Sequence, residues 1–299
     1  MYVIGLDCGG TSTEALLATT NGEFLGRGRG GPANYTSNGV KAVVESSKQA
    51  VEGALSQAKL DLEPVHSHGV VLAAGVSGAS RPHDLIHLTQ AFQKGGYQNA
   101  VIGHDAVIAL YGALSGHDGV IVISGTGSIA YGKHKERTVR VGGWGYLLGD
   151  EGSAFKISLH ALQYIMWGYD GRGPRDRALE QAALGYFQIP SVEQLVLVLY
   201  RLPLDRGYIG GFTKTLTTLA AEGNTICIRI LQEAGVELGR LALAAIERLE
   251  LMEQPGRVGA CGGVFAAGSL ILQPMQDMIR TKAPAQIVSV PDFEPVVGA

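Results

Sequence analysis

Short apolar runs alternate along this chain with longer segments in which apolar residues recur at three- and four-residue steps. The short runs predict strands, and the longer segments predict helices that bury one face. The first part of the chain is expected to contain, in order, strands at 2–8, 13–19 and 22–30, a helix at 39–58, a strand at 69–74, a helix at 83–94 and a strand at 100–103. The run at 69–74 is apolar throughout, which is typical of a strand covered on both faces.

The second part of the chain repeats this order and then becomes helical. Strands are predicted at 119–124, 128–132 and 137–142. Helices predominate from Gly152 to about Met252, and the longest is expected after Asn224, where apolar residues form one stripe. We therefore predict two α/β domains, residues 1–114 and residues 115–299, with a helical insertion in the second.

A glycine-hydroxyl turn follows the first predicted strand. It consists of Gly9, Gly10, Thr11, Ser12 and Thr13, and Asp7 lies just before it. Adjacent glycines let the backbone turn sharply and bring its N–H groups close to a polyanion, to which the hydroxyls add donors. The carboxylate of Asp7 is placed where a metal ion on phosphate oxygens would need a ligand. The alternative is a glycine-rich hairpin with a solvated aspartate.

A similar turn, Gly125-Thr126-Gly127, follows the strand predicted at 119–124. A chain with two such turns, one in each half, resembles the actin-like ATPase superfamily, whose members hold a nucleotide between two duplicated domains. A third element, the pair Gly262 and Gly263 after a short strand, resembles the adenosine loop of that superfamily. Taken singly, this pair favours an ordinary turn between a strand and a helix.

Composition narrows the class of protein. The chain has 299 residues, of which 46% are hydrophobic, and this is enough for two domains with ordinary cores. A net charge of −3 without a basic stripe argues against nucleic acid as a partner. No run of about 18 apolar residues and no basic leader occur, so we expect a cytoplasmic protein that does not bind membranes. Three scattered cysteines and eight unclustered histidines predict neither a disulfide framework nor a zinc site.

Asp105 is the candidate catalytic residue. It lies just past the strand predicted at 100–103 and at the start of a helix, where an aspartate is often only a cap. Ligands of open α/β sheets gather beyond the carboxyl ends of the strands, where both glycine-hydroxyl turns also point. Phosphoryl transfer to an alcohol requires that the hydroxyl be aligned and its proton accepted, and one carboxylate can do both.

The segment 142–154 is a second dense patch, with five glycines around one tryptophan and two acids. Trp144 lies between glycines and has room to present its indole face to a ligand, although a position in the core is the alternative. Asp150 can cap the helix that begins near Gly152, or it can accept hydrogen bonds from sugar hydroxyls.

Four segments together carry a specific family resemblance: GLDCGGTSTEA at 5–15, HDAVIAL at 104–110, SGTGS at 124–128 and GGWGYLLGDEGSA at 142–154. They are similar to the N-acetylglucosamine kinase group of the BadF/BadG/BcrA/BcrD ATPase family, and the resemblance covers nearly the whole chain. It implies an α/β, two-domain actin-like ATPase fold, a duplicated ribonuclease H-like fold with the ligand cleft between the domains. It also implies an ATP- and Mg²⁺-dependent kinase, expected as a homodimer, that phosphorylates the 6-hydroxyl of N-acetylglucosamine or a closely related sugar.

The resemblance also assigns roles to individual residues. Those implied in sugar binding are Asn34, Ser77, Asp105, Gly125, Thr126, Trp144 and Asp150. Those implied in nucleotide binding are Gly9, Gly10, Thr11, Ser12, Thr13, Thr126, Gly127, Gly262 and Gly263. Asp105 would also be the catalytic base, and Asp7 would be the metal ligand.

The sequence departs from the family pattern in two places. Kinases that resemble the animal N-acetylglucosamine enzyme carry an acid near Ser80, so a contact to the sugar or its acyl group is expected to differ here. The chain also stops at Ala299, within a phrase that opens a last helix in the family.

The residues leave other functions open. An ATPase activator of a 2-hydroxyacyl-CoA dehydratase would need cysteines that hold an iron–sulfur cluster between subunits, and Cys8, Cys227 and Cys261 do not form the necessary pair. A non-catalytic sugar- or nucleotide-binding protein would need no base. Among kinase substrates, N-acetylglucosamine, glucosamine, N-acetylmuramic acid and glucose all remain alternatives.

Overall fold

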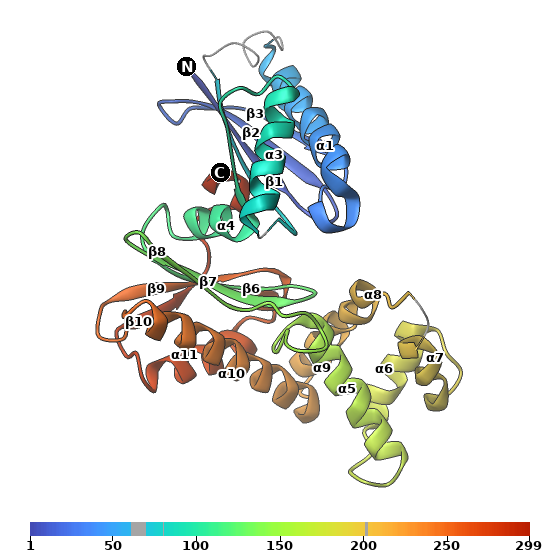
Figure 1. Ribbon diagram of the computed structural model, residues 1–299. Helices are drawn as coiled ribbons and strands as arrows, with labels where there is room; N and C mark the ends of the chain where they lie inside the picture. The colour runs from blue at the N-terminus through green and yellow to red at the C-terminus, as the bar shows by residue number, and fades with distance from the viewer. Residues whose placement is uncertain (61–69, 80, 201–202) are drawn as a thin grey trace. The chain divides into compact units, whose positions relative to one another are not determined.

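The computed structural model describes residues 1–60, 70–79, 81–200 and 203–299 (Figure 1). These residues form two compact units. Unit 1 comprises Met1–His117 and Pro291–Ala299, and unit 2 comprises Asp118–Val290. Ser80, where the family pattern is not followed, lies outside the described residues.

The C-terminal segment groups with unit 1, whereas the boundaries expected from the sequence, 1–114 and 115–299, place it in the second domain. The backbone N–H of Phe293 donates to the carbonyl of Gly112 at 3.0 Å. The hydroxyl of Ser115 hydrogen bonds to the carboxylate of Asp292 at 2.6 Å. These contacts join segments that are far apart in the sequence, and a boundary drawn along the chain does not include them.

Unit 1 contains a five-stranded sheet with the order β3-β2-β1-β4-β5. Its strands are β1 (Tyr2–Cys8), β2 (Thr13–Thr19), β3 (Phe24–Gly30), β4 (Val70–Val76) and β5 (Ala100–His104). The first three strands form an antiparallel meander, while β1, β4 and β5 are parallel. The strands predicted from the apolar runs are therefore all present.

Alternate residues of β1 bury one face of this sheet, because successive side chains point to opposite faces. Ile4, Leu6 and Cys8 belong to the core that also includes residues of α1 (Tyr35–Ala58) and α3 (Pro82–Lys94). Figure 1 shows α1 and α3 lying over the same face.

The opposite face of the unit 1 sheet carries small residues, and two short helices approach it closely. A Cβ on Gly75 would lie 2.4 Å from Ile108 of α4 (Asp105–Ala113), and a Cβ on Gly5 would lie 2.5 Å from the Val296 carbonyl of α12 (Pro295–Gly298). The expectation that β4 is covered on both faces is correct only near Gly75. Val71 is 37% exposed because these helices do not reach its end of the strand.

Helix α1 begins earlier than its apolar pattern predicts. The side chain of Asn34 caps it, since Oδ1 accepts a hydrogen bond from the N–H of Ser37 at 3.0 Å. Gly39, with φ of 75°, then interrupts the helical conformation. The regular apolar stripe begins only after this interruption, which explains why the sequence placed the start at residue 39.

Unit 2 repeats the topology of unit 1, with the strand order β10-β9-β6-β7-β8. The strands are β6 (Gly119–Ser124), β7 (Ser128–His134), β8 (Arg137–Gly142), β9 (Gly256–Cys261) and β10 (Gln286–Ser289). A meander of β6, β7 and β8 is again extended by parallel strands on the other side of the first strand. The two units are thus duplicates in topology, as the sequence predicted.

Helices fill the rest of unit 2. They are α5 (Ala154–Tyr169), α6 (Arg177–Phe187), η1 (Val192–Gln194), α7 (Leu195–Tyr200), α8 (Arg206–Gly211), α9 (Thr213–Ala221), α10 (Thr225–Arg248), η2 (Gly263–Ala267) and α11 (Ser269–Arg280). The predicted long helix after Asn224 is α10, and its buried stripe joins the core of unit 2.

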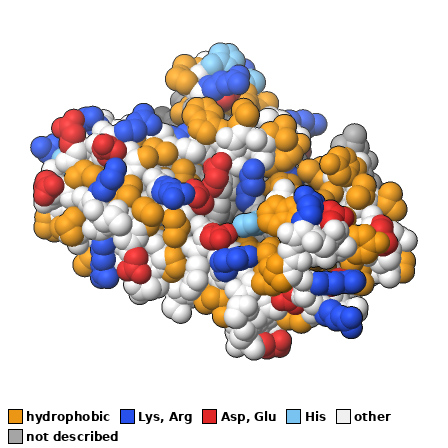
Figure 2. Space-filling model, turned by 90° about the horizontal axis from the view of Figure 1, so that it is seen from below, with side chains coloured by type: hydrophobic (Ala, Val, Ile, Leu, Met, Phe, Trp, Pro, Cys, Tyr) orange, Lys and Arg blue, Asp and Glu red, His pale blue; other side chains and the backbone are white. Residues whose placement is uncertain are grey.

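No single helix in the described part of the chain is long and apolar enough to cross a membrane. One bent pair, Arg177–Phe187 with Val192–Tyr200, meets the requirement by length and composition alone, and residues of both segments belong to the core of unit 2. On the face of the molecule in Figure 2, acidic and basic side chains are interspersed.

Candidate active site

Three parallel strands of unit 1 end at the same edge of the sheet. Cys8 of β1 is in register with Val76 of β4, and Val76 is in register with His104 of β5. The next residues after β4 and β5, Ser77 and Asp105, therefore extend from neighbouring strand ends beside the turn that follows β1. This is the edge at which open α/β sheets bind ligands.

Asn34, Ser77 and Asp105 form one polar network at this edge. Nδ2 of Asn34 donates to Oγ of Ser77 at 3.2 Å, and the Ser77 hydroxyl hydrogen bonds to the carboxylate of Asp105. Because Asn34 also caps α1, its side chain is held in place from both ends. The structure thus brings together three of the residues implied in sugar binding, although they come from separate elements.

The carboxylate of Asp105 is ionised and partly accessible. His104 Nδ1 lies 2.9 Å from its Oδ1, and the Ala106 N–H donates to the same oxygen at 2.8 Å. Burial acts to raise the pKa of Asp105, but the hydrogen bond and charge of His104, with the Ser77 and Ala106 hydrogen bonds, outweigh it and lower this pKa. With its side chain 35% exposed, Asp105 can accept a proton from a ligand.

His104 contacts the candidate base, although the sequence pattern did not single it out. It occupies the N-cap position of α4, directly before Asp105, and contacts its carboxylate. The sequence signal for His104 is its position directly before Asp105, since a histidine next to a candidate base can shift the pKa of that base.

Asp7 lies near Asp105, and its pKa is shifted in the opposite direction. Burial, followed by the negative charges of Asp105 and Glu14, raises the pKa of Asp7 to about 6. Two carboxylates whose surroundings shift their pKa values in opposite directions are typical of a catalytic site. Asp7 precedes the first glycine-hydroxyl turn, as predicted.

The first turn is closed by a hydrogen bond from the Gly9 N–H to the Ser12 carbonyl at 3.0 Å. Gly10, Thr11 and Ser12 are exposed, so their N–H and hydroxyl groups are accessible to a ligand. Thr13 is not. Its side chain is fully buried, and its hydroxyl donates to the Gly31 carbonyl at 2.8 Å.

The nucleotide contact implied for Thr13 stays a prediction, and its hydroxyl does not support it here, because this group holds β2 to the segment after β3. The glycines of this turn do not adopt the left-handed conformation that often requires glycine. Neither Gly9 nor Gly10 has a left-handed φ, and a Cβ on Gly10 would have open space around it. Glycine at position 10 thus keeps the backbone uncovered.

The second turn, in unit 2, is closed by a hydrogen bond from the Gly125 N–H to the Gly127 carbonyl at 2.9 Å. The Ala154 N–H at the start of α5 donates to the Gly125 carbonyl at 2.8 Å. Thr126 is exposed at the tip. The buried hydroxyls of Ser124 and Ser128 also donate to the 151–152 backbone, which fixes the turn against α5.

Asp150 is 5% exposed and directed at this second turn. Its Oδ1 accepts a hydrogen bond from the Ser128 N–H at 3.4 Å, and a Cβ on Gly127 would lie 3.0 Å from its Oδ2. Its backbone has a φ of 65°, which is unusual for a residue other than glycine. The carboxylate therefore supports the turn, and the sugar contact implied for Asp150 stays a prediction.

Trp144 is 67% exposed, so the alternative of a core position is wrong. The guanidinium of Arg140 lies 5.2 Å from the centroid of its ring. Gly143 and Gly145 on either side have positive φ values. One face of the indole is thus covered by a cation, which stabilises the ring by a cation–π interaction.

The predicted adenosine loop lies at the end of β9, the strand next to β6. Gly262 has a φ of 106°, and a Cβ there would lie 2.3 Å from the Ser124 carbonyl. Gly263 is exposed with open space around it. The adenosine loop and the second turn therefore adjoin at neighbouring strand ends.

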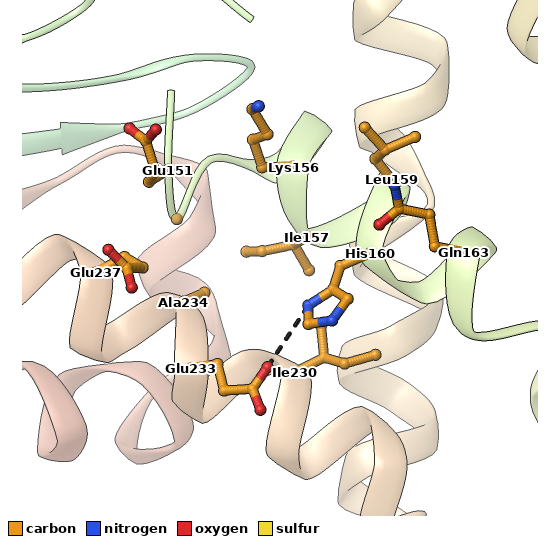
Figure 3. A pocket seen from close by; sticks show the side chains of 11 residues that line it. Glu151, Lys156, Ile157, Leu159, His160, Gln163, Ile230, Glu233, Ala234 and Glu237 are labelled. Carbon is orange, nitrogen blue, oxygen red and sulfur yellow. Dashed lines mark ion pairs between the residues drawn. The ribbon is translucent and has the colours of Figure 1, made fainter. Parts of the chain in front are cut away.

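A hollow of about 430 Å³ in unit 2 lies elsewhere, between α5 and α10 (Figure 3). Figure 3 shows His160 directed at Glu233, and Nδ1 of the histidine lies 3.5 Å from Oε2 of the glutamate. Its lining contains none of the residues predicted to bind sugar or nucleotide.

The cysteines do not support the dehydratase-activator alternative. Cys8, Cys227 and Cys261 are all buried, and burial raises the pKa of each thiol to about 12. Such thiols pack as small apolar groups and are poor cluster ligands. Within the described ranges, no three His, Cys, Asp or Glu side chains are grouped so that they could hold a metal ion.

Two α/β units of the same topology, each with a glycine-hydroxyl turn at the end of its first strand, define a duplicated nucleotide-binding fold of the actin-like ATPase class. The sequence pattern of the BadF/BadG/BcrA/BcrD ATPase family matches residues 4–299, and the chain belongs to this family.

Individual relatives agree with this assignment. The chain is 32% identical to an N-acetylmuramic acid/N-acetylglucosamine kinase of Clostridium acetobutylicum, over 88% of this chain and 85% of that protein. It is 30% identical to an N-acetyl-D-glucosamine kinase of Dictyostelium discoideum, over 64% and 62%. The solved structure of a candidate N-acetylglucosamine kinase from Chromobacterium violaceum superposes with a TM-score of 0.78 and 25% identity, over 99% and 96% of the two chains. The chain is accordingly a sugar kinase, a phosphotransferase.

Proposed function

We propose that this kinase transfers the γ-phosphate of ATP to the 6-hydroxyl of N-acetylglucosamine. The observation that carries the proposal is the network of Asn34, Ser77 and Asp105 at one edge of the unit 1 sheet. An amide, a hydroxyl and a carboxylate in contact are the groups that bind sugar hydroxyls. The names of the relatives add the N-acetylated sugar.

Asp105 is the base in this proposal. Its pKa is lowered, so the carboxylate is ionised at neutral pH and can accept the proton of the hydroxyl as the new O–P bond forms. His104 and the Ala106 N–H hold the carboxylate in one orientation. Phosphoryl transfer depends chiefly on positioning, and Asp105 supplies both alignment and proton acceptance.

The nucleotide phosphates are assigned to the two turns. Gly10, Thr11 and Ser12 offer exposed donors in unit 1, and Thr126 and the 125–127 backbone offer them in unit 2. Backbone N–H and hydroxyl donors of this kind are the groups that bind phosphate oxygens.

Mg²⁺ fits the residues present on the phosphate side of unit 1. This ion commonly takes one or two carboxylates together with phosphate oxygens and water, and Asp7 is a carboxylate beside the first turn. When bound, the ion would neutralise charge on the phosphate oxygens. Asp7 would serve as its ligand from the protein. The expected homodimer also stays a prediction.

Trp144 and Asp150 are the residues of unit 2 to which we assign a part in sugar recognition. The free face of the exposed indole is a flat apolar surface for the acetyl methyl group. The buried Asp150 carboxylate would act mainly by positioning the 125–127 turn. Preference for the acetylated sugar over glucose is then expected to be about 10- to 200-fold, because one small apolar group contributes roughly that much discrimination.

The test combines product analysis with one substitution. ADP release is measured with N-acetylglucosamine, glucosamine and glucose, and the position of the phosphate in the product is read by phosphorus–proton NMR correlation. Asp105→Asn is expected to lower kcat by about 10²- to 10⁴-fold, because it removes the base. Asparagine keeps an oxygen that can accept from the Ala106 N–H, so an aspartate with only a structural role at the start of α4 would tolerate this change.

Asp176→Asn is the control, because it makes the same substitution at the start of another helix, where Oδ1 of Asp176 accepts from the Leu179 N–H at 2.9 Å. It should leave kcat within about twofold. Phosphate at another hydroxyl, or an Asp105→Asn enzyme with more than a tenth of the original kcat, would refute the proposal.

A further inference from the structure

Arg140 lies in strand β8, shortly before Trp144, and neither the sequence pattern nor the family resemblance assigned it a role. Its backbone is held from two sides. It pairs with Tyr131 of β7 in the sheet, and its carbonyl accepts a hydrogen bond from Nη1 of Arg248 at 2.9 Å. The side chain of Arg140 therefore extends from a fixed point just before the glycine-rich segment 142–154.

The guanidinium of Arg140 contacts this segment in two ways. Nη2 donates to the Gly143 carbonyl at 2.5 Å, and Cζ lies 5.2 Å from the centroid of the Trp144 ring. Among the described residues the guanidinium forms no ion pair, so its charge is not shared with a carboxylate. The cation is attracted to the face of the indole, and the hydrogen bond to Gly143 fixes where along the segment this attraction acts.

The backbone on both sides of Trp144 is glycine. Gly143 and Gly145 have φ values of 69° and 83°, a conformation that favours glycine, and neither has a side chain that could pack against the ring. Trp144 itself is 67% exposed. An exposed indole rotates about two side-chain bonds and loses that freedom when it binds a ligand. A contact that orders the ring beforehand lowers this cost.

We propose that Arg140 is the positioning residue for Trp144 and thereby determines how strongly the kinase prefers an N-acylated sugar. The inference rests on the proposed function, in which the free face of the indole receives the acetyl methyl group. With the guanidinium on one face, only the opposite face is available to a ligand, and the ring is ordered before the sugar binds. Glucose has a hydroxyl in place of the acetamido group and does not use this surface.

A double-mutant cycle tests whether Arg140 acts through the indole. The measured quantity is the ratio of kcat/KM for N-acetylglucosamine to kcat/KM for glucose, in the wild-type enzyme, Arg140→Met, Trp144→Ala and the double variant. Methionine keeps an unbranched apolar side chain and removes the charge and the donors. Arg140→Met should lower the ratio by about 3- to 10-fold, within the range of a cation–π contact, through a higher KM for N-acetylglucosamine with kcat nearly unchanged.

In the Trp144→Ala background, the same substitution should have no further effect on the ratio, because the ring through which Arg140 acts is gone. Arg140→Lys keeps a cation and should retain part of the preference. Arg137→Met is the control for the loss of an arginine from β8, because the Arg137 guanidinium bonds instead to Glu250 and to the Arg248 carbonyl. It should leave the ratio within about twofold.

Fluorescence gives a readout that does not depend on turnover. The chain has two tryptophans, so Trp167→Phe leaves Trp144 as the only one. In that background, Arg140→Met should make the fluorescence anisotropy of Trp144 decay faster on the nanosecond timescale, because the ring moves more freely. Arg137→Met should leave the decay unchanged.

An unchanged ratio in Arg140→Met, or an equal loss with and without Trp144, would overturn the inference, and the proposed function would stand. An unchanged anisotropy decay in Arg140→Met would also overturn the inference. Full preference for the acetylated sugar in Trp144→Ala would overturn it together with the part assigned to Trp144. A wild-type enzyme that uses glucose better than N-acetylglucosamine would instead overturn the proposed function, and the inference with it.

Discussion

The two units have the same topology, but different groups surround their glycine-hydroxyl turns. In unit 1, the residue one position before the end of the first strand is Asp7, a carboxylate with a raised pKa. The corresponding residue of β6 in unit 2 is Ile123. Unit 2 instead directs Asp150 at its turn from another segment and buries it.

This difference divides the proposed chemistry between the units. The two carboxylates with shifted pKa values near the first turn, Asp7 and Asp105, are both in unit 1. In unit 2 the polar side chains around the turn, Ser124, Ser128 and Asp150, are buried and bonded to the backbone. The proposed function therefore assigns acid–base and metal chemistry to unit 1 and rigid support of the phosphates to unit 2.

The largest expected effect comes from crowding the two turns. Gly127→Val should lower kcat/KM for ATP by more than about 10²-fold, because the new side chain meets the Asp150 carboxylate and covers the backbone donors of the turn. Gly10→Val should impair turnover as well, but its Cβ meets no protein atom within 4 Å, so the thermal stability of the protein should be unchanged.

Calorimetric titration with Mg·ATP and thermal melts separate these two predictions. Loss of stability in Gly127→Val, with none in Gly10→Val, is the expected contrast. Gly185→Val in unit 2 provides a control for the substitution itself, because a Cβ there also has open space. Unchanged Mg·ATP affinity in a folded Gly127→Val protein would remove the second turn from the phosphate site.

The next effect is a pH dependence that originates in unit 1. The pKa of Asp7 is raised to about 6, and metal binding requires the ionised form. As pH falls through about 6, kcat/KM should fall roughly tenfold per pH unit, since this quantity reports the free enzyme.

The neighbouring charge of Asp105 contributes to the raised pKa of Asp7. In Asp105→Asn, the midpoint for Mg·ATP binding, followed by calorimetry, should therefore move to lower pH. Asp150→Asn, in the other unit, should leave the midpoint in place. A midpoint that stays near pH 6 in Asp105→Asn would show that the two carboxylates are not coupled.

The smallest effect is on stability, measured without nucleotide or metal. The folded-state pKa of Asp7 lies above its ordinary value, so its contribution to stability is fully present at low pH and is lost as pH rises through about 6. Asp7→Asn removes this penalty at pH 8 and should raise Tm by about 2–4 °C while it weakens Mg·ATP binding.

The same substitution at pH 4 should leave Tm nearly unchanged, because Asp7 is then protonated and neutral in the folded protein. Asp150→Asn provides the contrast in unit 2, where the carboxylate accepts a backbone hydrogen bond and its replacement should not stabilise the fold. A lower Tm for Asp7→Asn at pH 8 would contradict the assigned electrostatics.

Local patterns in the sequence were enough to predict the strands, the two turns and the position of Asp105. Each depends on neighbours a few residues apart: an apolar run predicts a strand, adjacent glycines and hydroxyls predict a turn, and a carboxylate after a strand lies at the ligand edge of the sheet. The family motifs are equally local, and their match to residues 4–299 confirms the family.

Only the tertiary structure determined which polar groups of these local motifs are free to bind a ligand. Thr13 and Thr11 are indistinguishable as turn hydroxyls in the sequence, but the Gly31 carbonyl, from another segment, takes the hydroxyl of Thr13. The Asn34–Ser77 contact joins residues 43 positions apart, and the C-terminal segment returns to unit 1 through the Phe293–Gly112 hydrogen bond. Burial, hydrogen-bond partners and pKa shifts arise from such long-range packing, because each depends on atoms that the chain brings close only when it folds.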